Sequence, residues 1–340
     1  MTSLPLFQHR DPLDILQYSQ AFPAYVTPFR SAPSCDVDPC FLSWFLGFSE
    51  AEGCFKIWRG SGTTRPRMFF SLSQREEAIC LFIQRELGFG HVSRDSPLSP
   101  VFRFQCSSKK DIMRLIHLFQ GNLLLKKTTR RFHQWVECFH SLHGTTVPLL
   151  SRHGLGLPCD SEAGVGLPLP GSAFDHEICV HHSVLWTSGW LAGFLDGEGC
   201  FSASPTVSPS TSRCRFRGSV SVTQKGEPEL LMHLAVLLDG GSLVTHPSSD
   251  DTWTYKTSGL GPLAKLHDYL TRFPLRTRKR WSYGIWSLIK TRIEKVGGHL
   301  QPREVHRVRM LARLINSHSS SPPPPTSPGL EIKGPGCLRV

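Results

Sequence analysis

Three patterns are missing from this sequence, and each absence excludes a class of protein. There is no run of about 18 apolar residues, so no membrane-spanning helix is predicted. The N-terminus has no basic stretch followed by an apolar one, which argues against secretion. The 11 cysteines contain no Cys-x-x-Cys pair, so free thiols in a reducing compartment are expected rather than a zinc module or a disulfide framework.

The chain does have enough apolar residues to fold, together with an excess of positive charge. Hydrophobic residues make up 39% of the 340 residues and charged residues 19%, which predicts packed domains rather than a disordered chain. The formal net charge of +11 favours a polyanionic partner, because Lys and Arg that neutralise phosphates release counterions. Charge alone does not distinguish a nucleic-acid partner from a solvated basic surface.

One unit of sequence occurs twice. FLGFSEAEGCF at residues 45–55 recurs as LAGFLDGEGCF at 191–201, and a tryptophan precedes each copy. Internal repetition of this kind predicts two copies of one folded unit. The predicted parts are an N-terminal extension at 1–36, a first repeat at 37–143, a Gly/Pro-rich linker at 144–182, a second repeat at 183–316 and a disordered tail at 317–340.

Hydrophobic periodicity predicts the order helix, hairpin, helix, hairpin, helix in each half. The first half has predicted helices at 39–50, 75–87 and 109–142, and strands at 54–59, 67–73, 91–95 and 101–106. The second half has predicted helices at 186–197, 228–238 and 261–291, and strands at 200–204, 215–223, 242–246 and 252–257. We call the helices at 39–50 and 186–197 the motif helices.

Small residues lie four apart along both motif helices. They are Ser43, Gly47 and Ala51 in the first helix, and Gly189, Gly193 and Gly197 in the second. Three glycines inside one helix cost about 3 kcal/mol relative to alanine, and a close approach of two helix backbones would offset that cost. We therefore predict that the motif helices pack against each other through these positions. The alternative is that each stripe packs under its own sheet.

Each motif helix ends with a glutamate followed by a glycine, at Glu52 and Glu198. The C-terminus of a helix carries a partial negative charge, so acids there are disfavoured unless a cation binds. Carboxylates and backbone carbonyls, here those of Ala51 and Gly197, are hard oxygen ligands for Mg²⁺, for which Mn²⁺ can substitute. The pattern indicates a phosphodiester-cleaving metal centre.

Alternation along the predicted strands gathers basic and hydroxyl side chains on one face of each sheet. Two-stranded ribbons fit the major groove of DNA, where Arg can bond guanine and Gln adenine, while other polar residues contact phosphates. For any single residue, a solvated surface is the alternative. The predicted DNA-contacting residues are Lys56, Trp58, Arg67, Ser71, Arg103, Gln105, Arg215, Arg217, Ser219, Ser221, Thr223, Lys225, Thr252, Thr254 and Lys256.

The two motifs resemble those of the LAGLIDADG homing endonucleases in their double-motif, single-chain form, over roughly residues 39–300. The resemblance implies an α+β fold of two pseudo-symmetric αββαββα repeats, packed through the motif helices, whose antiparallel sheets form a DNA-binding saddle. By the same resemblance, Glu52 and Glu198 match the metal-binding catalytic positions, whereas Glu50 and Asp196 match an earlier acidic position that is not catalytic.

The resemblance also implies supporting catalytic residues. It places Gln74 and Gln224 near the catalytic water. It implies one cation in each half, from Lys126 or Lys127 and from Arg276 or Lys279, of which we assign Lys126 and Arg276. Lys225 is a further candidate.

These features predict a monomeric, magnesium-dependent homing endonuclease that makes double-strand breaks in a long DNA target. The alternative is an intron maturase, an RNA-binding splicing cofactor on the same fold, which would bind the host intron RNA. A DNA-binding regulator without catalysis is a third class, and the presence of both Glu52 and Glu198 argues against it. By the resemblance to this family, we expect the protein to be encoded by an intron of an organelle genome, the mitochondrion ahead of the chloroplast.

Overall fold

The three-dimensional structure is a computed structural model. It describes residues 37–59, 65–144, 185–207, 214–246, 249–258, 260–296 and 300–315. The predicted extension 1–36, the predicted tail 317–340 and the predicted linker after Gly144 lie outside the described residues. The chain divides into two compact units between Phe194 and Leu195.

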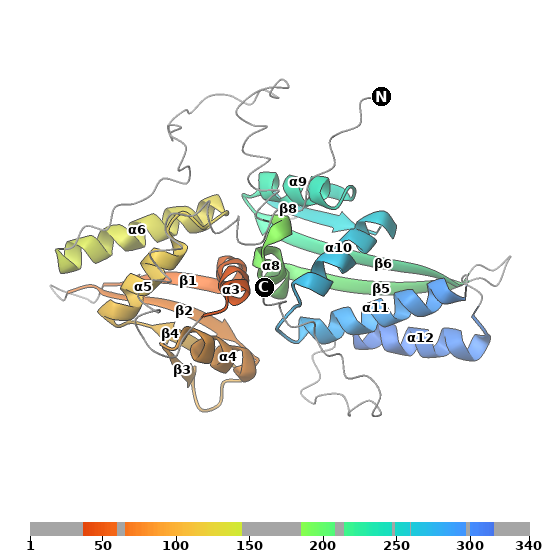
Figure 1. The fold of residues 1–340 in the computed structure, drawn as a ribbon, viewed down its shortest axis with the longest axis horizontal. Helices are drawn as coiled ribbons and strands as arrows, with labels where there is room; N and C mark the ends of the chain where they lie inside the picture. The colour runs from red at the N-terminus through yellow and green to blue at the C-terminus, as the bar shows by residue number, and fades with distance from the viewer. Residues whose placement is uncertain are drawn as a thin grey trace, which may run out of the picture. The chain divides into compact units, whose positions relative to one another are not determined.

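The first unit holds one antiparallel sheet with the strand order β1-β2-β4-β3 (Figure 1). Its elements are α3 (Pro39–Glu52), β1 (Gly53–Trp58), β2 (Arg67–Gln74), α4 (Glu77–Leu87), β3 (His91–Arg94), β4 (Phe102–Cys106), α5 (Lys109–Phe119) and α6 (Lys126–His143). The first five residues of α8 (Trp190–Glu198) also belong to this unit.

The second unit repeats this order around a sheet with the strand order β5-β6-β8-β7. After the end of α8 come β5 (Gly199–Val207), β6 (Cys214–Lys225), α9 (Pro228–Leu237), β7 (Ser242–His246), β8 (Ser249–Thr257), α10 (Leu260–Arg272), α11 (Lys279–Lys295) and α12 (Pro302–Leu314). Among the described helices, none combines the length and the apolar character that a membrane crossing requires.

Local sequence signals set the helix ends in the first unit. α3 begins behind Asp38, whose carboxylate accepts the N–H of Cys40 at 2.9 Å. α5 begins behind Ser108, whose hydroxyl oxygen accepts the N–H of Asp111 at 3.1 Å. α4 ends at Gly88, where a φ of 69° requires the left-handed conformation that glycine adopts without strain.

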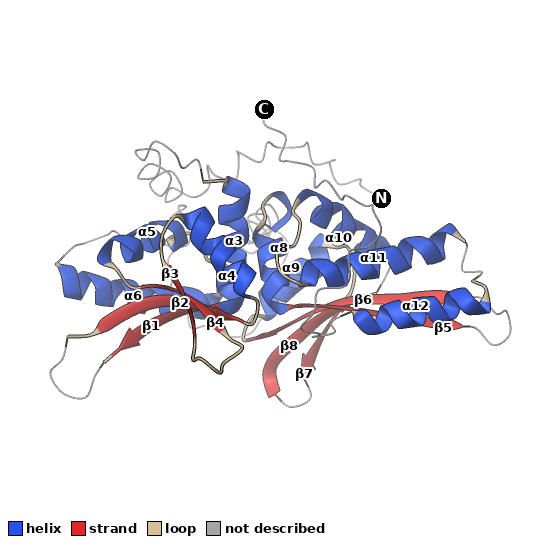
Figure 2. Ribbon diagram, turned by 90° about the horizontal axis from the view of Figure 1, so that it is seen from below, coloured by secondary structure: helices blue, strands red, loops and turns tan. Residues whose placement is uncertain are grey.

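Each sheet has one face under helices and one face that no described helix covers (Figure 2). On the covered face of the first sheet, Met68, Phe70 and Leu72 alternate along β2 and are at most 5% exposed. Val220 and Val222 of β6 do the same in the second unit. Burying such a side chain contributes about 1.5–3 kcal/mol, so the alternation of the strands fixes which face turns outward. We call the two outward faces the open faces.

The element order confirms the predicted α+β class with two antiparallel sheets in repeated order, and it corrects the final helices. The single helix predicted over 109–142 is wrong, because Gln120 leaves the helix with a ψ of 121° and Gly121 takes a φ of 74°. The predicted helix 261–291 is likewise two helices, α10 and α11, and α12 follows them without having been predicted. The second motif helix begins at Trp190, whose N–H donates to Ser188 Oγ at 3.3 Å, and not at residue 186.

Candidate functional site

Within the first unit, the start of the second motif helix lies against the first motif helix. A Cβ added to Gly47 would lie 1.9 Å from the carbonyl oxygen of Trp190. A Cβ added to Gly193 would lie 1.9 Å from the carbonyl oxygen of Trp44. The two helix backbones therefore touch at these two positions, which only glycine permits.

Another of the small residues, Gly189, makes a direct contact with the first motif helix. The N–H of Gly189, just before α8, donates to Ser43 Oγ at 3.0 Å. A Cβ on Gly189 would lie 2.9 Å from the carbonyl oxygen of Cys40, so this glycine is also required by space. Ala51 is half-buried next to Glu52 at the end of α3.

Glu52 and Glu198 occupy the same place in their units, as the last residue of a motif helix. Both are half-buried, and the glycine that follows each begins the first strand of the sheet. Gly53 has an extended backbone with a φ of −79°, so it ends the helix without the left-handed conformation. A Cβ there would lie 2.3 Å from the carbonyl oxygen of Ser49, which explains the glycine by space.

Glu50 is buried two residues before Glu52 and binds the loop between α5 and α6. Its carboxylate accepts the N–H groups of Leu124 and Leu125 at 2.8–2.9 Å. It also accepts the indole N–H of Trp190 at 2.8 Å. The loop that breaks the predicted helix 109–142 is thus anchored to the first motif helix by a charged acceptor.

Asp196 has the same role in the second unit. It is buried and accepts the backbone N–H of Arg276 at 2.7 Å, the backbone N–H of Thr277 at 3.2 Å and the hydroxyl of Thr277 at 2.5 Å. Leu124 and Leu125 therefore correspond to Arg276 and Thr277, and the same spacing pairs Lys127 with Lys279.

This correspondence separates the candidate cations of the second unit. Lys279 Nζ donates to two backbone carbonyl oxygens at the end of α8. It makes a short hydrogen bond to Gly197 and one of 3.3 Å to Leu195. Arg276, which the resemblance also offered, gives its backbone N–H to Asp196. In the first unit, Lys126 and Lys127 are both exposed at the start of α6. The second-unit contacts favour Lys279, and the spacing favours Lys127.

Gln74 and Gln224 lie at the ends of equivalent strands. Gln74 is the last residue of β2 and pairs with Phe102, and Gln224 is the penultimate residue of β6 and pairs with Trp253. Both are half-buried. Strand alternation gives Gln74 the same side of the sheet as Leu72, so neither glutamine belongs to the open face.

The register of the first sheet brings its predicted DNA-contacting residues onto one open face. Trp58 pairs with Arg67, and Ser71 pairs with both Cys54 and Gln105. The Arg67 guanidinium lies 5.8 Å from the Trp58 ring centroid, and Lys56 Nζ lies 5.9 Å from that of Phe69. These contacts orient the two cations over aromatic rings. Neighbours on this face that sequence alone did not identify are Phe69, Ser73, His91 and Ser93.

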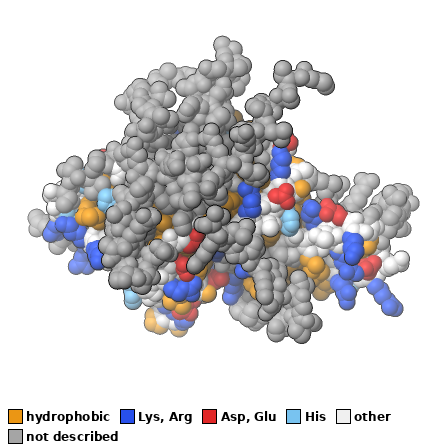
Figure 3. All heavy atoms as spheres, in the orientation of Figure 1, with side chains coloured by type: hydrophobic (Ala, Val, Ile, Leu, Met, Phe, Trp, Pro, Cys, Tyr) orange, Lys and Arg blue, Asp and Glu red, His pale blue; other side chains and the backbone are white. Residues whose placement is uncertain are grey.

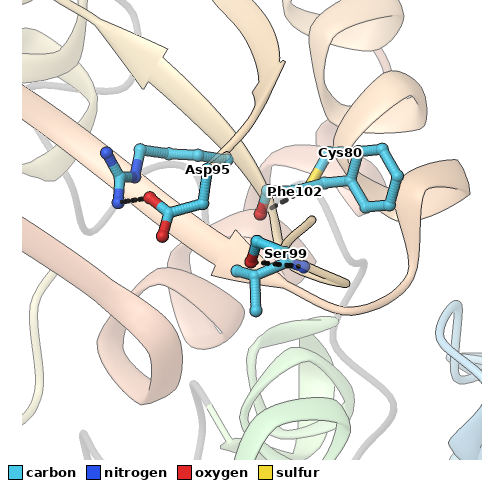
Figure 4. Close-up of polar contacts among 6 residues, drawn as sticks. Cys80, Asp95, Ser99 and Phe102 are labelled. Carbon is cyan, nitrogen blue, oxygen red and sulfur yellow. Dashed lines mark hydrogen bonds and ion pairs between the residues drawn. The ribbon is translucent and has the colours of Figure 1, made fainter. Parts of the chain in front are cut away.

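Arg103 also lies on this face, but an acid holds it. Its guanidinium makes a short ion pair with Asp95, beyond the end of β3 (Figure 4). In the same turn, the N–H of Val101 donates to Ser99 Oγ at 3.1 Å. Behind the turn, the Cys80 thiol donates to the Phe102 carbonyl oxygen at 3.9 Å, and burial raises the pKa of this thiol to about 11. Arg103 is therefore a positioned cation rather than a loose one.

The second sheet repeats the arrangement with more hydroxyl groups. Its register pairs predicted residues across strands, Ser221 with Lys256, Thr223 with Thr254 and Lys225 with Thr252. It also pairs the predicted Arg217 and Arg215 with two further hydroxyl residues, Ser204 and Thr206. Ser219 is buried, and its hydroxyl forms a hydrogen bond of 2.6 Å with that of Ser202. Ser71 is buried in the first sheet, so both serines lie deeper than the basic residues around them. Cys200, Ser202, Ser204, Thr206 and Ser242 were not identified from sequence.

Comparison with known proteins decides the family. A family model described as LAGLIDADG endonuclease matches the chain twice, over residues 45–139 and 191–289. The chain belongs to the LAGLIDADG endonuclease family. Each match runs from a motif helix into α6 or α11, so the resemblance drawn from the two motifs is confirmed.

Named relatives of this LAGLIDADG protein include "Probable intron-encoded endonuclease 4" of Neurospora crassa. It is 26% identical over 277 residues, which is 81% of this chain and 44% of the relative. "Probable intron-encoded endonuclease Cox1-I1b" of Schizosaccharomyces pombe is 23% identical over 221 residues, which is 62% of this chain and 54% of the relative. The chain spans about half the length of these relatives.

Solved structures of the family share the fold. The LAGLIDADG meganuclease I-AabMI, bound to uncleaved DNA, matches with a TM-score of 0.58 and 19% identity over 81% of this chain and 99% of that chain. The LAGLIDADG homing endonuclease I-GzeII, in complex with its DNA target, matches with a TM-score of 0.55 and 17% identity over 84% of this chain and 100% of that chain. I-SmaMI, bound to uncleaved DNA in the presence of calcium ions, matches with a TM-score of 0.55 and 17% identity over 81% of this chain and 99% of that chain.

Proposed function

We propose that this chain is a metal-dependent, site-specific DNA endonuclease in which each repeat contributes to cutting one strand. The observation that carries the proposal is made once in each unit. Glu52 and Glu198 end a motif helix where the chain enters a sheet with a polar open face. The repeats would be residues 37–143 and 183–316, joined by the linker 144–182, so that one chain suffices as a monomer.

The donor groups at each motif-helix end suit Mg²⁺. Among the described residues, no three His, Cys, Asp or Glu side chains gather into a metal-binding group. Mg²⁺ does not need such a cage, because it keeps several waters and binds through one or two carboxylates and phosphate oxygens. Lys279 Nζ donates to the carbonyl oxygens of Leu195 and Gly197. The C-terminal end of α8 therefore attracts positive charge. Glu52 and Glu198, with the carbonyls of Ala51 and Gly197, would hold Mg²⁺ or Mn²⁺.

A bound divalent cation would activate water and stabilise the leaving oxygen of the phosphodiester. The chain's own groups would do the rest. Lys127 and Lys279 would stabilise the charge that develops on the phosphate, with Lys126 and Arg276 as the alternative pair. The amide groups of Gln74 and Gln224 would orient the attacking water.

The open faces would contact duplex DNA. Arg67, Lys225 and Lys256 are exposed and project from strands, which suits a ribbon in the major groove. The hydroxyl pair Thr223–Thr254, with its oxygens 2.9 Å apart, offers donors and acceptors to bases or phosphates. I-AabMI and I-GzeII, whose fold this chain shares, are described as bound to DNA, which supports the assignment.

An intron maturase is the alternative function for this fold. The relatives are named endonucleases, and both glutamates are present, so cutting is favoured over splicing alone. Because the relatives are named intron-encoded, we also propose that an organellar intron encodes this chain, with the mitochondrion ahead of the chloroplast.

The test is cleavage of a supercoiled plasmid that carries the uninterrupted exon junction of the host intron. With Mg²⁺, the wild-type protein should produce linear plasmid. Glu52→Gln and Glu198→Gln should each reduce linear product by about a hundredfold or more while still binding the plasmid, because the amide keeps the shape but not the charge. Glu77→Gln is the matched control, since Glu77 is an exposed acid on α4. Cutting by both variants at the wild-type rate would overturn the assignment. So would binding and splicing of the intron RNA without any cutting of DNA.

A further inference from the structure

The second unit ends in a helix that lies beyond the part of the chain matched by the family model. The second match stops at residue 289, and α12 runs from Pro302 to Leu314. α12 is well started, because Gln301 and Glu304 form a reciprocal capping box. It packs against α11 and β5, and Val305 and Val308 are its buried residues (Figures 1 and 2).

The exposed surface of α12 is basic. The helix carries four arginines against one glutamate, a formal net charge of +3 with its histidine neutral. The glutamate, Glu304, accepts from Arg292 of α11 at 2.5 Å and also attracts Arg307, so a single acid faces the four arginines of this helix. The exposed basic residues are Arg303, His306, Arg307, Arg309 and Arg313. Figure 3 shows Lys and Arg side chains gathered on the part of the second unit that carries α11 and α12.

The position of α12 links this charge to the open face. β5, against which α12 packs, is the edge strand of the second sheet. The same strand pairs Ser204 with Arg217 and Thr206 with Arg215 at positions of the open face. α12 therefore borders the sheet at the strand where the open face ends.

We propose that the exposed arginines of α12 bind the phosphate backbone of duplex DNA beside the segment contacted by the second sheet. The duplex as ligand rests on the proposed function. Long arginine side chains spread around an exposed helix suit the backbone, which offers charge everywhere, better than base edges, which need a fixed bidentate geometry. The contacts would add sequence-independent affinity and help set the orientation of the protein on its target.

The decisive measurement is the salt dependence of binding to a duplex that lacks the target sequence, without divalent ions. The logarithm of the association constant falls linearly with the logarithm of the salt concentration, and each lost phosphate contact reduces the steepness of this slope by about 0.9. Arg307→Gln, Arg309→Gln and Arg313→Gln together should lower it by up to about 2.7. The affinity ratio of wild type to variant should then shrink by up to about 40-fold between about 50 and 200 mM salt.

Two control proteins separate position from charge. The triple Arg→Lys variant at 307, 309 and 313 should keep the wild-type slope, because lysine also neutralises phosphate. Arg85→Gln, Lys110→Gln and Lys265→Gln together remove the same charge from exposed positions of α4, α5 and α10 and should also keep the slope.

An unchanged slope in the α12 variant overturns the inference. The inference also fails if the variant with Gln at 85, 110 and 265 loses as much of the slope as the α12 variant does. It fails too if the α12 variant loses affinity for structured RNA but none for duplex DNA. The measurement needs no cleavage. A wild-type protein that never cuts would therefore refute the nuclease assignment while the slope still decided the role of α12.

Discussion

Gly47→Ala tests the contact on which the motif-helix packing depends. The new methyl carbon would lie 1.9 Å from the Trp190 carbonyl oxygen and 2.8 Å from its carbonyl carbon. Ordinary contact begins at 3.4 Å, so the helices must separate by about 1.5 Å at this point. Backbone cannot rotate away as a flexible side chain does, so the overpacking cost should reach about 3 kcal/mol, the upper part of the usual range. Alanine returns about 1 kcal/mol of helix propensity, which leaves a net loss of about 2 kcal/mol.

Gly284→Ala is the matched control. Gly284 lies inside α11, and a Cβ there meets nothing within 4 Å. The same substitution should therefore stabilise the second unit by about 1 kcal/mol. The free energies of unfolding of the two variants should therefore differ by about 3 kcal/mol, with Gly47→Ala less stable and Gly284→Ala more stable than wild type.

Urea denaturation followed by tryptophan fluorescence measures this difference. Trp44 and Trp190 are each 1% exposed and flank the contact, so their emission reports on it. The reasoning is refuted if Gly47→Ala is as stable as wild type while Gly284→Ala gains stability as expected. That result would mean that the helix backbones are not in contact at Gly47.

Two further predictions concern the contacts of Asp196 and the reactivity of two cysteines. Asp196→Asn should cost about 1.5–3 kcal/mol in the urea denaturation of the second unit, because Arg276 and Thr277 lose a charged acceptor. It should also lower plasmid cutting more than duplex binding, because the loop that leads into Lys279 at the start of α11 loosens. Unchanged cutting and stability would contradict this role. In iodoacetamide labelling at pH 8 followed by mass spectrometry, exposed Cys200 should react while Cys80 does not, since a pKa of about 11 leaves roughly one thiolate in a thousand. Duplex DNA should slow labelling of Cys200, which lies on the open face, and equal rates with and without DNA would argue against contact there.

The features that could be predicted from the sequence depend on patterns among residues close together in the chain. Repeated motifs and strand alternation identified the two sheets and the residues that share their open faces. The missed features depend on contacts between distant residues. Periodicity runs without a break through 109–142, and the helix ends at Phe119 because the following loop is bound by Glu50, far away in the sequence. The pairing of Arg103 with Asp95 likewise depends on the turn between β3 and β4.

Helix geometry turns the two acids of each motif in different directions. Positions two apart on a helix differ by about 200°, so Glu50 and Glu52 point to nearly opposite sides of α3. Glu50 is turned into the protein and satisfies loop N–H groups, and Glu52 lies half-buried at the junction with β1. An acid with that loop already bonded to it cannot serve a metal without releasing those N–H groups, which are costly to leave unpaired. The spacing Glu-x-Glu and Asp-x-Glu therefore commits the first carboxylate to the fold and leaves the second, Glu52 or Glu198, for the proposed metal centre.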